Sequence, residues 1–321
     1  VTDESLAALS DTLFSIAVGL YSLAVVAFCA ELAFGGRKAP ARELVAAGGG
    51  APVNPAAGGD VDDEPAKARR WGMVAMGLTA LGALVQAGVL VTRGTATGRL
   101  PWGNMYEFGT AVVLVAVVVY LVLAVRTPSL RHIGVFVLAP VVLSMVGIGL
   151  FLYASAGPLV AALRSAWLAV HVTTAILGFG IFFVSGIASV MYLVRSRYEA
   201  KVAAGEQPLS RIVHRLPSAA ALDRTAHRTV VFGFPIWTFA VIAGAIWAES
   251  AWGRFWGWDP KETWAFIAWV VYAAYLHART TAGWRGRPSA WVNVVGLGVM
   301  VFNLLYVNMV STGLHSYGGL K

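Results

Sequence analysis

The feature that most constrains this chain is a series of eight apolar stretches, each about 20 residues long. An α-helix needs about 20 apolar residues to cross the hydrocarbon core of a bilayer. Over the whole chain 58% of residues are hydrophobic and only 12% are charged, whereas a soluble domain has about 25% charged residues. The sequence therefore predicts an all-α, polytopic membrane protein and excludes an ordinary soluble enzyme. The predicted spans are Thr12–Phe34, Trp71–Thr92, Phe108–Val125, Ile133–Tyr153, Trp167–Val194, Val230–Ala248, Thr263–Arg279 and Ala290–Val310.

The basic residues indicate how these spans are oriented. Residues 1–11 contain no Lys or Arg, so we expect residues 1–34 to form a retained anchor with its N-terminus outside, not a cleaved signal peptide. Most of the 24 Lys and Arg fall in the loops after the first, third, fifth and seventh spans, and the positive-inside rule puts those loops in the cytoplasm. Both termini are then outside. The net charge of +8 thus reflects orientation in a cell membrane, and it indicates no nucleic-acid partner.

Two of the cytoplasmic segments have unusual compositions. Residues 35–70 are rich in Gly, Ala and Pro and contain the acidic run Asp60–Glu64, so we expect a flexible linker. The basic segment 195–229 is partly helical in pattern, and we expect it to lie along the anionic lipids of the inner leaflet. Cys29 is the only cysteine, which excludes a CxxC redox pair and a cysteine zinc site.

The densest group of candidate functional residues is the outer loop at 249–264, between the sixth and seventh spans, which we call the tryptophan loop. Its glycines let the backbone approach a ligand closely, and indole faces suit a planar macrocycle. An aromatic belt at the lipid–water boundary is the alternative, but a belt accounts for neither the glycines nor the nearby cations. The loop residues are Trp252, Gly253, Arg254, Trp256, Gly257, Trp258, Asp259, Lys261 and Trp264.

Part of this loop also has the pattern of a helix start. Asp259 suits the N-cap position, Pro260 the first helical position and Glu262 the third, as in a capping box. These residues alone leave open whether Asp259 and Glu262 begin a helix or contact a ligand. Arg254 and Lys261 flank the aromatic cluster on a face where basic residues are scarce, which favours ligand contacts.

The string WGRFWGWDPKETWAF closely resembles the tryptophan-rich WWD motif of heme-handling membrane proteins. Its continuation, with YLHAR at 275–279 and GWRG at 283–286, resembles the CcsA (ResC) family of the system II pathway of cytochrome c biogenesis. Further matches occur in order: NMYE at 104–107, WLAVH at 167–171 and GLHSYG at 313–318. The resemblance implies a heme-handling membrane domain over residues 71–321. It also adds Asn104, Tyr106 and Glu107 to the candidate site residues.

Three of the six histidines have positions that suit heme iron, since neutral imidazole is the commonest metal ligand in proteins. His171 opens the fifth span and His315 follows the eighth, so both can reach the tryptophan loop. The resemblance implies that they are the axial ligands of an outer heme. His277 lies roughly 25 Å along the seventh span, in the inner half of the membrane, where an ionisable residue is a functional candidate. For His277 the resemblance implies a transmembrane heme site.

The resemblance also implies a function. The chain would carry heme b to its outer site and present it there to apocytochrome c, whose CxxCH cysteines form thioether bonds with the heme vinyl groups. The tryptophans would hold the ring, and Arg254 or Lys261 would meet a propionate.

The same resemblance implies two further kinds of partner. No second histidine lies at the depth of His277, so a ResB (CcsB) type membrane protein would supply one, and thiol-reducing proteins would act on the apocytochrome. The apolar spans also predict contact with membrane lipids. Two alternative functions stay open: a heme exporter or chaperone without synthase activity, and a b-type electron-transfer subunit with two fixed hemes.

Overall fold

Eight long helices form almost all of the regular structure. The computed structural model describes residues 3–35, 65–158, 165–206, 210, 212–281 and 283–315, and these residues contain no β-strand. The all-α prediction is therefore confirmed. The helices are α1 (Glu4–Phe34), α2 (Ala66–Thr97), α3 (Met105–Arg126), α4 (Gly134–Phe151), α5 (Ala166–Ala203), α6 (Ala219–Trp252), α7 (Pro260–Thr280) and α8 (Arg287–Met309), with short 3-10 turns at Pro128–Ile133 and Val213–Arg215.

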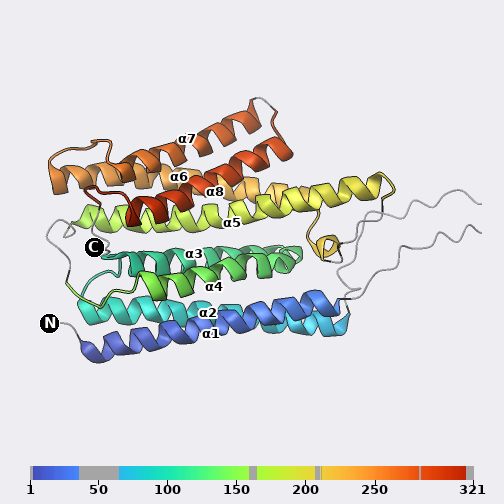
Figure 1. Ribbon diagram of the computed structural model, residues 1–321, viewed down its shortest axis with the longest axis horizontal. Coiled ribbons are helices and arrows are strands. Elements are labelled where there is room, and N and C mark those ends of the chain that lie inside the picture. The colour runs from blue at the N-terminus through green and yellow to red at the C-terminus, as the bar shows by residue number, and fades with distance from the viewer. Residues whose placement is uncertain are drawn as a thin grey trace, which may run out of the picture.

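Seven of these helices are long and apolar enough to cross a membrane. The exception is α7, which is present where the seventh span was expected but carries tryptophan, tyrosine and histidine in place of aliphatic side chains. Its 21 residues correspond to about 30 Å at 1.5 Å per residue, enough to match the hydrocarbon core. Helix α1 begins and α8 ends at the same end of the bundle (Figure 1).

Several helices extend beyond the predicted spans. Helix α2 begins at Ala66, so residues 66–70 of the predicted linker are helical, while residues 36–64 lie outside the described residues. The basic segment 195–229 is largely a continuation of α5 and α6, not a separate surface segment. No Gly or Pro interrupts residues 195–203, and Arg195 pairs with Glu199 one turn later at 2.8 Å, which supports a continuous helix.

The helices pack in layers around two large hydrophobic cores, and a small third cluster contains Leu168 and Trp247. Helix α1 runs along α2 and α5 along α6, and α3 and α4 lie between these two pairs (Figure 1). One core is formed mainly by the helices α1, α2, α3 and α4, with Tyr21, Tyr120 and Met145 fully buried. The other joins α3 to the C-terminal helices, with Phe182 stacked on Tyr272 at a centroid distance of 3.7 Å. Helix α7 lies on the outer side of α6 and α8.

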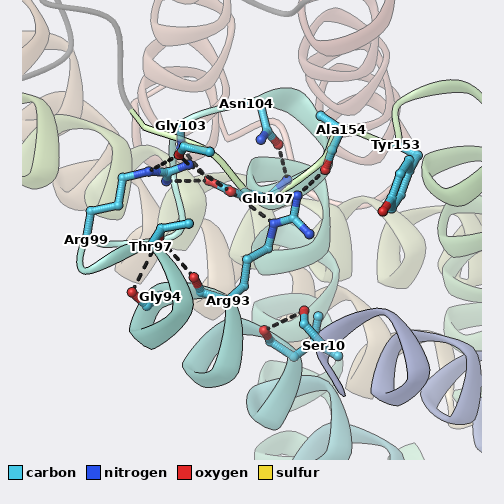
Figure 2. Close-up of polar contacts among 12 residues, drawn as sticks. Ser10, Arg93, Gly94, Thr97, Arg99, Gly103, Asn104, Glu107, Tyr153 and Ala154 are labelled. Atoms are coloured by element: carbon cyan, nitrogen blue, oxygen red, sulfur yellow. Dashed lines mark hydrogen bonds and ion pairs between the residues drawn. The ribbon is translucent and has the colours of Figure 1, made fainter. Parts of the chain in front are cut away.

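A buried ionic cluster fixes the end of the bundle at which α1 begins. The carboxylate of Glu107, at the start of α3, accepts hydrogen bonds from Arg93 Nε (3.0 Å), Arg99 Nη1 (2.8 Å) and the amide of Gly103 (2.6 Å). Arg93 is itself buried and also donates to the carbonyl of Ala154, after α4. Figure 2 shows Arg93 and Arg99 reaching Glu107 from two sides. The cluster therefore joins α2, α3, the loop between them and the segment after α4.

We predict that Glu107→Ala destabilises the bundle strongly. Removing one member of a buried ionic cluster leaves the guanidinium of Arg93 without its main counter-charge, which costs about 3–5 kcal/mol. The thermal unfolding midpoint in detergent should fall clearly. Asp11→Ala is the matched control, because the Asp11 carboxylate lies 3.5 Å from Arg93 but is 37% exposed, and its loss should lower the midpoint much less. Equal midpoints for Glu107→Ala and the wild type would contradict this account.

Candidate functional site

The non-helical part of the tryptophan-rich loop is shorter than the predicted loop at 249–264. Helix α6 ends at Trp252, where Gly253 adopts a left-handed conformation with φ 69°, and α7 begins after Asp259. Only residues 253–259 are non-helical. Trp258 has φ 56° and is the one non-glycine residue with positive φ in the part of the chain that the structure describes. A bulky residue in this region is strained, which indicates that the loop conformation is fixed by its surroundings.

Glu262 holds the loop from inside α7. Its Oε2 atom accepts hydrogen bonds from the amides of Gly257 (2.9 Å) and Asp259 (3.1 Å), which completes the predicted capping box. Arg254 Nη1 lies 3.7 Å from the same oxygen. A Cβ atom at residue 257 would lie 1.1 Å from that Nη1 atom, so only glycine allows the Arg254 side chain to lie against the loop.

Asp259 also binds the segment that follows α8. Its Oδ1 accepts from the amide of Leu314 and its Oδ2 accepts from Nδ1 of His315, both at 2.8 Å. One carboxylate therefore caps α7 and orients a histidine 56 residues away. Because Nδ1 of His315 is engaged, Nε2 is the ring nitrogen left for a metal, an arrangement typical of metal-binding histidines.

His171, in the first turns of α5, is held in a similar way by α6. Its Nδ1 lies 2.8 Å from the carbonyl oxygen of Ala240; a carbonyl only accepts, so Nδ1 carries the proton and Nε2 has the free lone pair. The ring lies so close to the α6 backbone that a Cβ at Gly244 would be 2.7 Å from it. Trp247 stacks on His171 at 6.0 Å and meets His315 edge-on at 5.7 Å. The two imidazoles thus lie on the same indole.

Both histidines line one hollow at this end of the bundle, which we call the tryptophan-side hollow. It has a volume of about 740 Å³ when its open mouth and the solvent there are included. Its deeper wall is apolar, with Phe179, Trp237 and Met300, and Phe255 and Trp256 lie at the loop. A flat, mostly apolar ligand with a metal at its centre matches these walls.

The tryptophans of the loop have different surroundings. Trp256 lines the tryptophan-side hollow, and Trp252 packs edge-on against His315 at 4.9 Å. Trp258 is 65% exposed and contacts Trp256 and Phe266. Trp264 packs on Phe302 of α8 at 4.3 Å. One indole therefore borders the hollow directly, and a second supports a histidine that does.

The cations beside the loop also differ. Lys261 lines the tryptophan-side hollow and donates from Nζ to the carbonyl of Asn303 at 3.2 Å. Arg254 is not among the lining residues and lies against Gly257 and Glu262. Lys261 is therefore the better placed of the two to meet an anionic group in the hollow.

The remaining candidates lie outside the tryptophan-side hollow. Asn104 caps α3 by accepting from the amide of Glu107 at 2.9 Å, and Tyr106 is buried under the guanidinium of Arg93 at 4.6 Å. Glu107 belongs to the ionic cluster described above. His277 is exposed on the outward face of α7, on the same face as Phe266 and Val270, so it does not contact the two outer histidines.

Sequence reasoning missed the supporting residues on α6. Ala240, Gly244 and Trp247 follow one another at the spacing i, i+4, i+7, which puts them on one helical face. That face ends at the tryptophan loop. The spacing of these three residues is therefore the sequence feature that could have indicated them. Which face points to His171 depends on tertiary packing, and the spacing alone does not give it.

Several known proteins are similar to this chain in sequence. The family model described as cytochrome C assembly protein matches residues 102–315. The cytochrome c biogenesis protein CcsA of Parasynechococcus marenigrum is 36% identical over 277 residues, covering 78% of this chain and 87% of its own length. CcsA of Guillardia theta is 34% identical over 268 residues, covering 77% and 86%. The chain belongs to the CcsA family of cytochrome c assembly proteins.

A solved structure shares the fold of this CcsA-family chain at low sequence identity. The cytochrome c heme lyase CcmF matches it with a TM-score of 0.56 and 16% identity, covering 98% of this chain and 53% of the other. The two proteins thus share a helical architecture. The family match at 102–315 begins in the loop that precedes α3 and ends at His315, so it includes both outer histidines and the tryptophan loop.

The charge of Asp259 is favoured by its partners. Partial burial raises the pKa of this carboxyl group, but the hydrogen bonds from His315 and Leu314 outweigh that effect, so the pKa lies below its ordinary value. A lowered pKa means that the bonds contribute fully above the ordinary carboxyl value of about 4 and are lost only as the pH falls through the lowered value. The Asp259–His315 bond should therefore persist through the neutral range.

We predict that Asp259→Ala releases the segment after α8 in this CcsA-family protein. A hydrogen bond to a charged group contributes about 1.5–3 kcal/mol, so the amide of Leu314 should exchange with deuterium about tenfold faster or more. Asp259→Asn keeps an oxygen that accepts and caps, and should give a smaller increase. Hydrogen exchange of the peptide containing Leu314 measures this, with Asp11→Ala as the control. Unchanged exchange in Asp259→Ala would show that the carboxylate does not hold the segment.

Proposed function

We propose that this chain delivers heme to the tryptophan-side hollow at the outer face of the cell membrane and presents it there to apocytochrome c for covalent attachment. The observation that carries this proposal is the pair His171 and His315. Each has its Nδ1 engaged by an acceptor, and both border one hollow. The 3-10 turn between α3 and α4 and the C-terminal end of α7, both expected on the cytoplasmic side, lie at the opposite end of the bundle (Figure 1), which agrees with an outer heme site.

Heme is the substrate of this reaction, and the chain's residues would hold and orient it. His171 and His315 would bind the iron through Nε2 as axial ligands. Trp256 and the apolar deeper wall would contact the ring, and Lys261 would meet a propionate. In each thioether bond the cysteine S–H adds across a vinyl C=C: the sulfur bonds to one carbon, the hydrogen to the other, and no oxidant is consumed.

The chain's contribution to that addition would be orientation and exclusion of water, which raise the effective concentration of the reacting groups. No side chain needs to act as a nucleophile, because the thiols come from the CxxCH sequence of the apocytochrome. Cys29 is the only cysteine, so thiol-reducing proteins would have to keep the substrate cysteines reduced.

A second membrane protein would complete an inner heme site. His277, Phe266 and Val270 are exposed on one face of α7, and no described helix of this chain covers that face. A membrane partner of the ResB (CcsB) type, with a histidine at the same depth, would supply a second ligand opposite His277. This arrangement explains why an ionisable side chain points away from its own bundle in a membrane protein.

We predict that His171→Ala and His315→Ala each remove one axial ligand of the outer heme. The absorption spectrum of the reduced protein should lose its bis-histidine form, and the yield of covalent heme on an apocytochrome reporter should fall at least about tenfold. Added imidazole should restore part of both, because it fills the vacated position. His214→Ala is the control, because His214 lies in the 3-10 turn before α6 and lines neither hollow. A variant that keeps the full spectrum and full yield would show that its histidine is not a ligand.

We predict that His277→Ala lowers inner-site heme only in the complex with the partner. The isolated chain should bind little heme at that site, because one imidazole on an exposed face gives incomplete coordination. Heme content would be measured for the wild type and for His277→Ala, each as the isolated chain and in the complex. Thr280→Ala, on the same exposed face, is the matched control. Six-coordinate inner heme in the isolated chain would contradict the two-protein site.

A further inference from the structure

A second hollow borders the same two histidines. It lies between the loop before α3 and the ends of α5, α6 and α8, and we call it the α3-side hollow. Its volume is about 650 Å³ including its open mouth. His171, His315 and Lys261 line both hollows, whereas Trp102, Asn104 and Asn308 line only this one. Whatever occupies the α3-side hollow is therefore next to a ring held between the two imidazoles.

The chemistry of this hollow differs from that of its neighbour. Apart from Lys261 and the two histidines, its lining carries no ionisable group, and Lys261 already donates to the carbonyl of Asn303. The amides of Asn104 and Asn308 offer neutral donors and acceptors. These amides suit the neutral amide groups of an extended peptide. The carboxylate of Glu262 lines the tryptophan-side hollow and not this one.

One donor in this hollow has no acceptor. Nε1 of Trp102 is buried and makes no hydrogen bond within the described residues. A buried indole N–H usually has a partner, and its desolvation costs free energy when it has none. A bound main-chain carbonyl at this position would satisfy it.

The wall that carries Trp102 is held rigidly from behind. Gly103, the next residue, donates its amide to Glu107 at 2.6 Å, and Arg99 binds both oxygens of the same carboxylate. Figure 2 shows Gly103 and Asn104 beside this cluster. Arg99 is paired with Glu107, and Arg93 with Glu107 and Asp11, so these two arginines are paired behind the wall and do not line the hollow. A fixed wall lowers the entropy cost of binding a flexible segment.

We propose that the α3-side hollow is the subsite for the CxxCH segment of apocytochrome c, with Trp102 Nε1 donating to a main-chain carbonyl of that segment. This inference rests on the proposed function and assigns the substrate protein to one side of the heme. Heme enters the tryptophan-side hollow, and the segment lies in the α3-side hollow, so that its thiols reach the ring edge from the side of the loop before α3. Trp102 is a substrate-binding residue in this arrangement, and Glu107 positions it.

The test separates peptide binding from bond formation. A fluorescent peptide in which serine replaces both cysteines of CxxCH binds without forming a thioether, and its dissociation constant is measured on the full chain purified with its membrane partner. Trp102→Phe removes the N–H and keeps an aromatic ring at this position. The loss of one hydrogen bond should raise the dissociation constant about three- to tenfold, with heme content and absorption spectrum unchanged.

The matched control is Trp256→Phe in the tryptophan-side hollow. It should alter heme binding and leave the dissociation constant of the peptide within about twofold. Equal peptide affinity in Trp102→Phe and the wild type would overturn the subsite. An equal loss of peptide affinity in Trp102→Phe and Trp256→Phe would also overturn it. Covalent heme on a CxxCH reporter is measured in the same preparations. A wild type that binds the serine peptide through Trp102 but attaches no heme would support the subsite and contradict the proposed synthase function.

Discussion

The carboxylate of Asp259 joins the start of α7 to the segment after α8, where His315 lies 56 residues further along the chain, and the geometry of the outer site depends on it. It ends the loop after α6, begins α7, and binds both Leu314 and His315. Because those bonds hold its pKa down, the charge that orients His315 is present at any physiological pH. This carboxylate supplies a hydrogen-bond acceptor to two consecutive residues of the segment after α8, Leu314 and His315. A helix cap thus also serves as the support of a proposed iron ligand.

The two histidines are oriented by different acceptors. His315 is bound by a carboxylate and His171 by the carbonyl of Ala240. A carboxylate partner makes an imidazole the more basic ligand, so the two axial positions of a bound heme would not be equivalent. Rigid support comes from α6, where Gly244 lets the His171 ring approach the backbone and Trp247 contacts both rings. The site is therefore built mainly between α5, α6 and the segment after α8.

The sequence was enough to predict the helices, because long apolar stretches have few other solutions in a membrane. Helix ends were less predictable: nothing in residues 195–203 stops α5 at the membrane boundary, so the helix continues. The capping pattern at Asp259 and Glu262 left two interpretations open, and the structure shows that Asp259 has a contact beyond the cap. That contact joins residues 56 positions apart, which no local pattern reveals. Likewise, motif spacing alone did not distinguish Trp256, which borders the hollow, from Trp258, which is exposed.

The central claim is that His171 and His315 ligate one heme through Nε2 in the tryptophan-side hollow. A cryo-electron microscopy map of the heme-loaded chain with its membrane partner tests this most directly. The account predicts an iron atom between the two Nε2 atoms, with the ring against Trp256 and the apolar wall of Phe179 and Met300. A ring bound elsewhere, or an iron ligated by only one of these histidines while the other keeps its contact to Asp259 or Ala240, would contradict it.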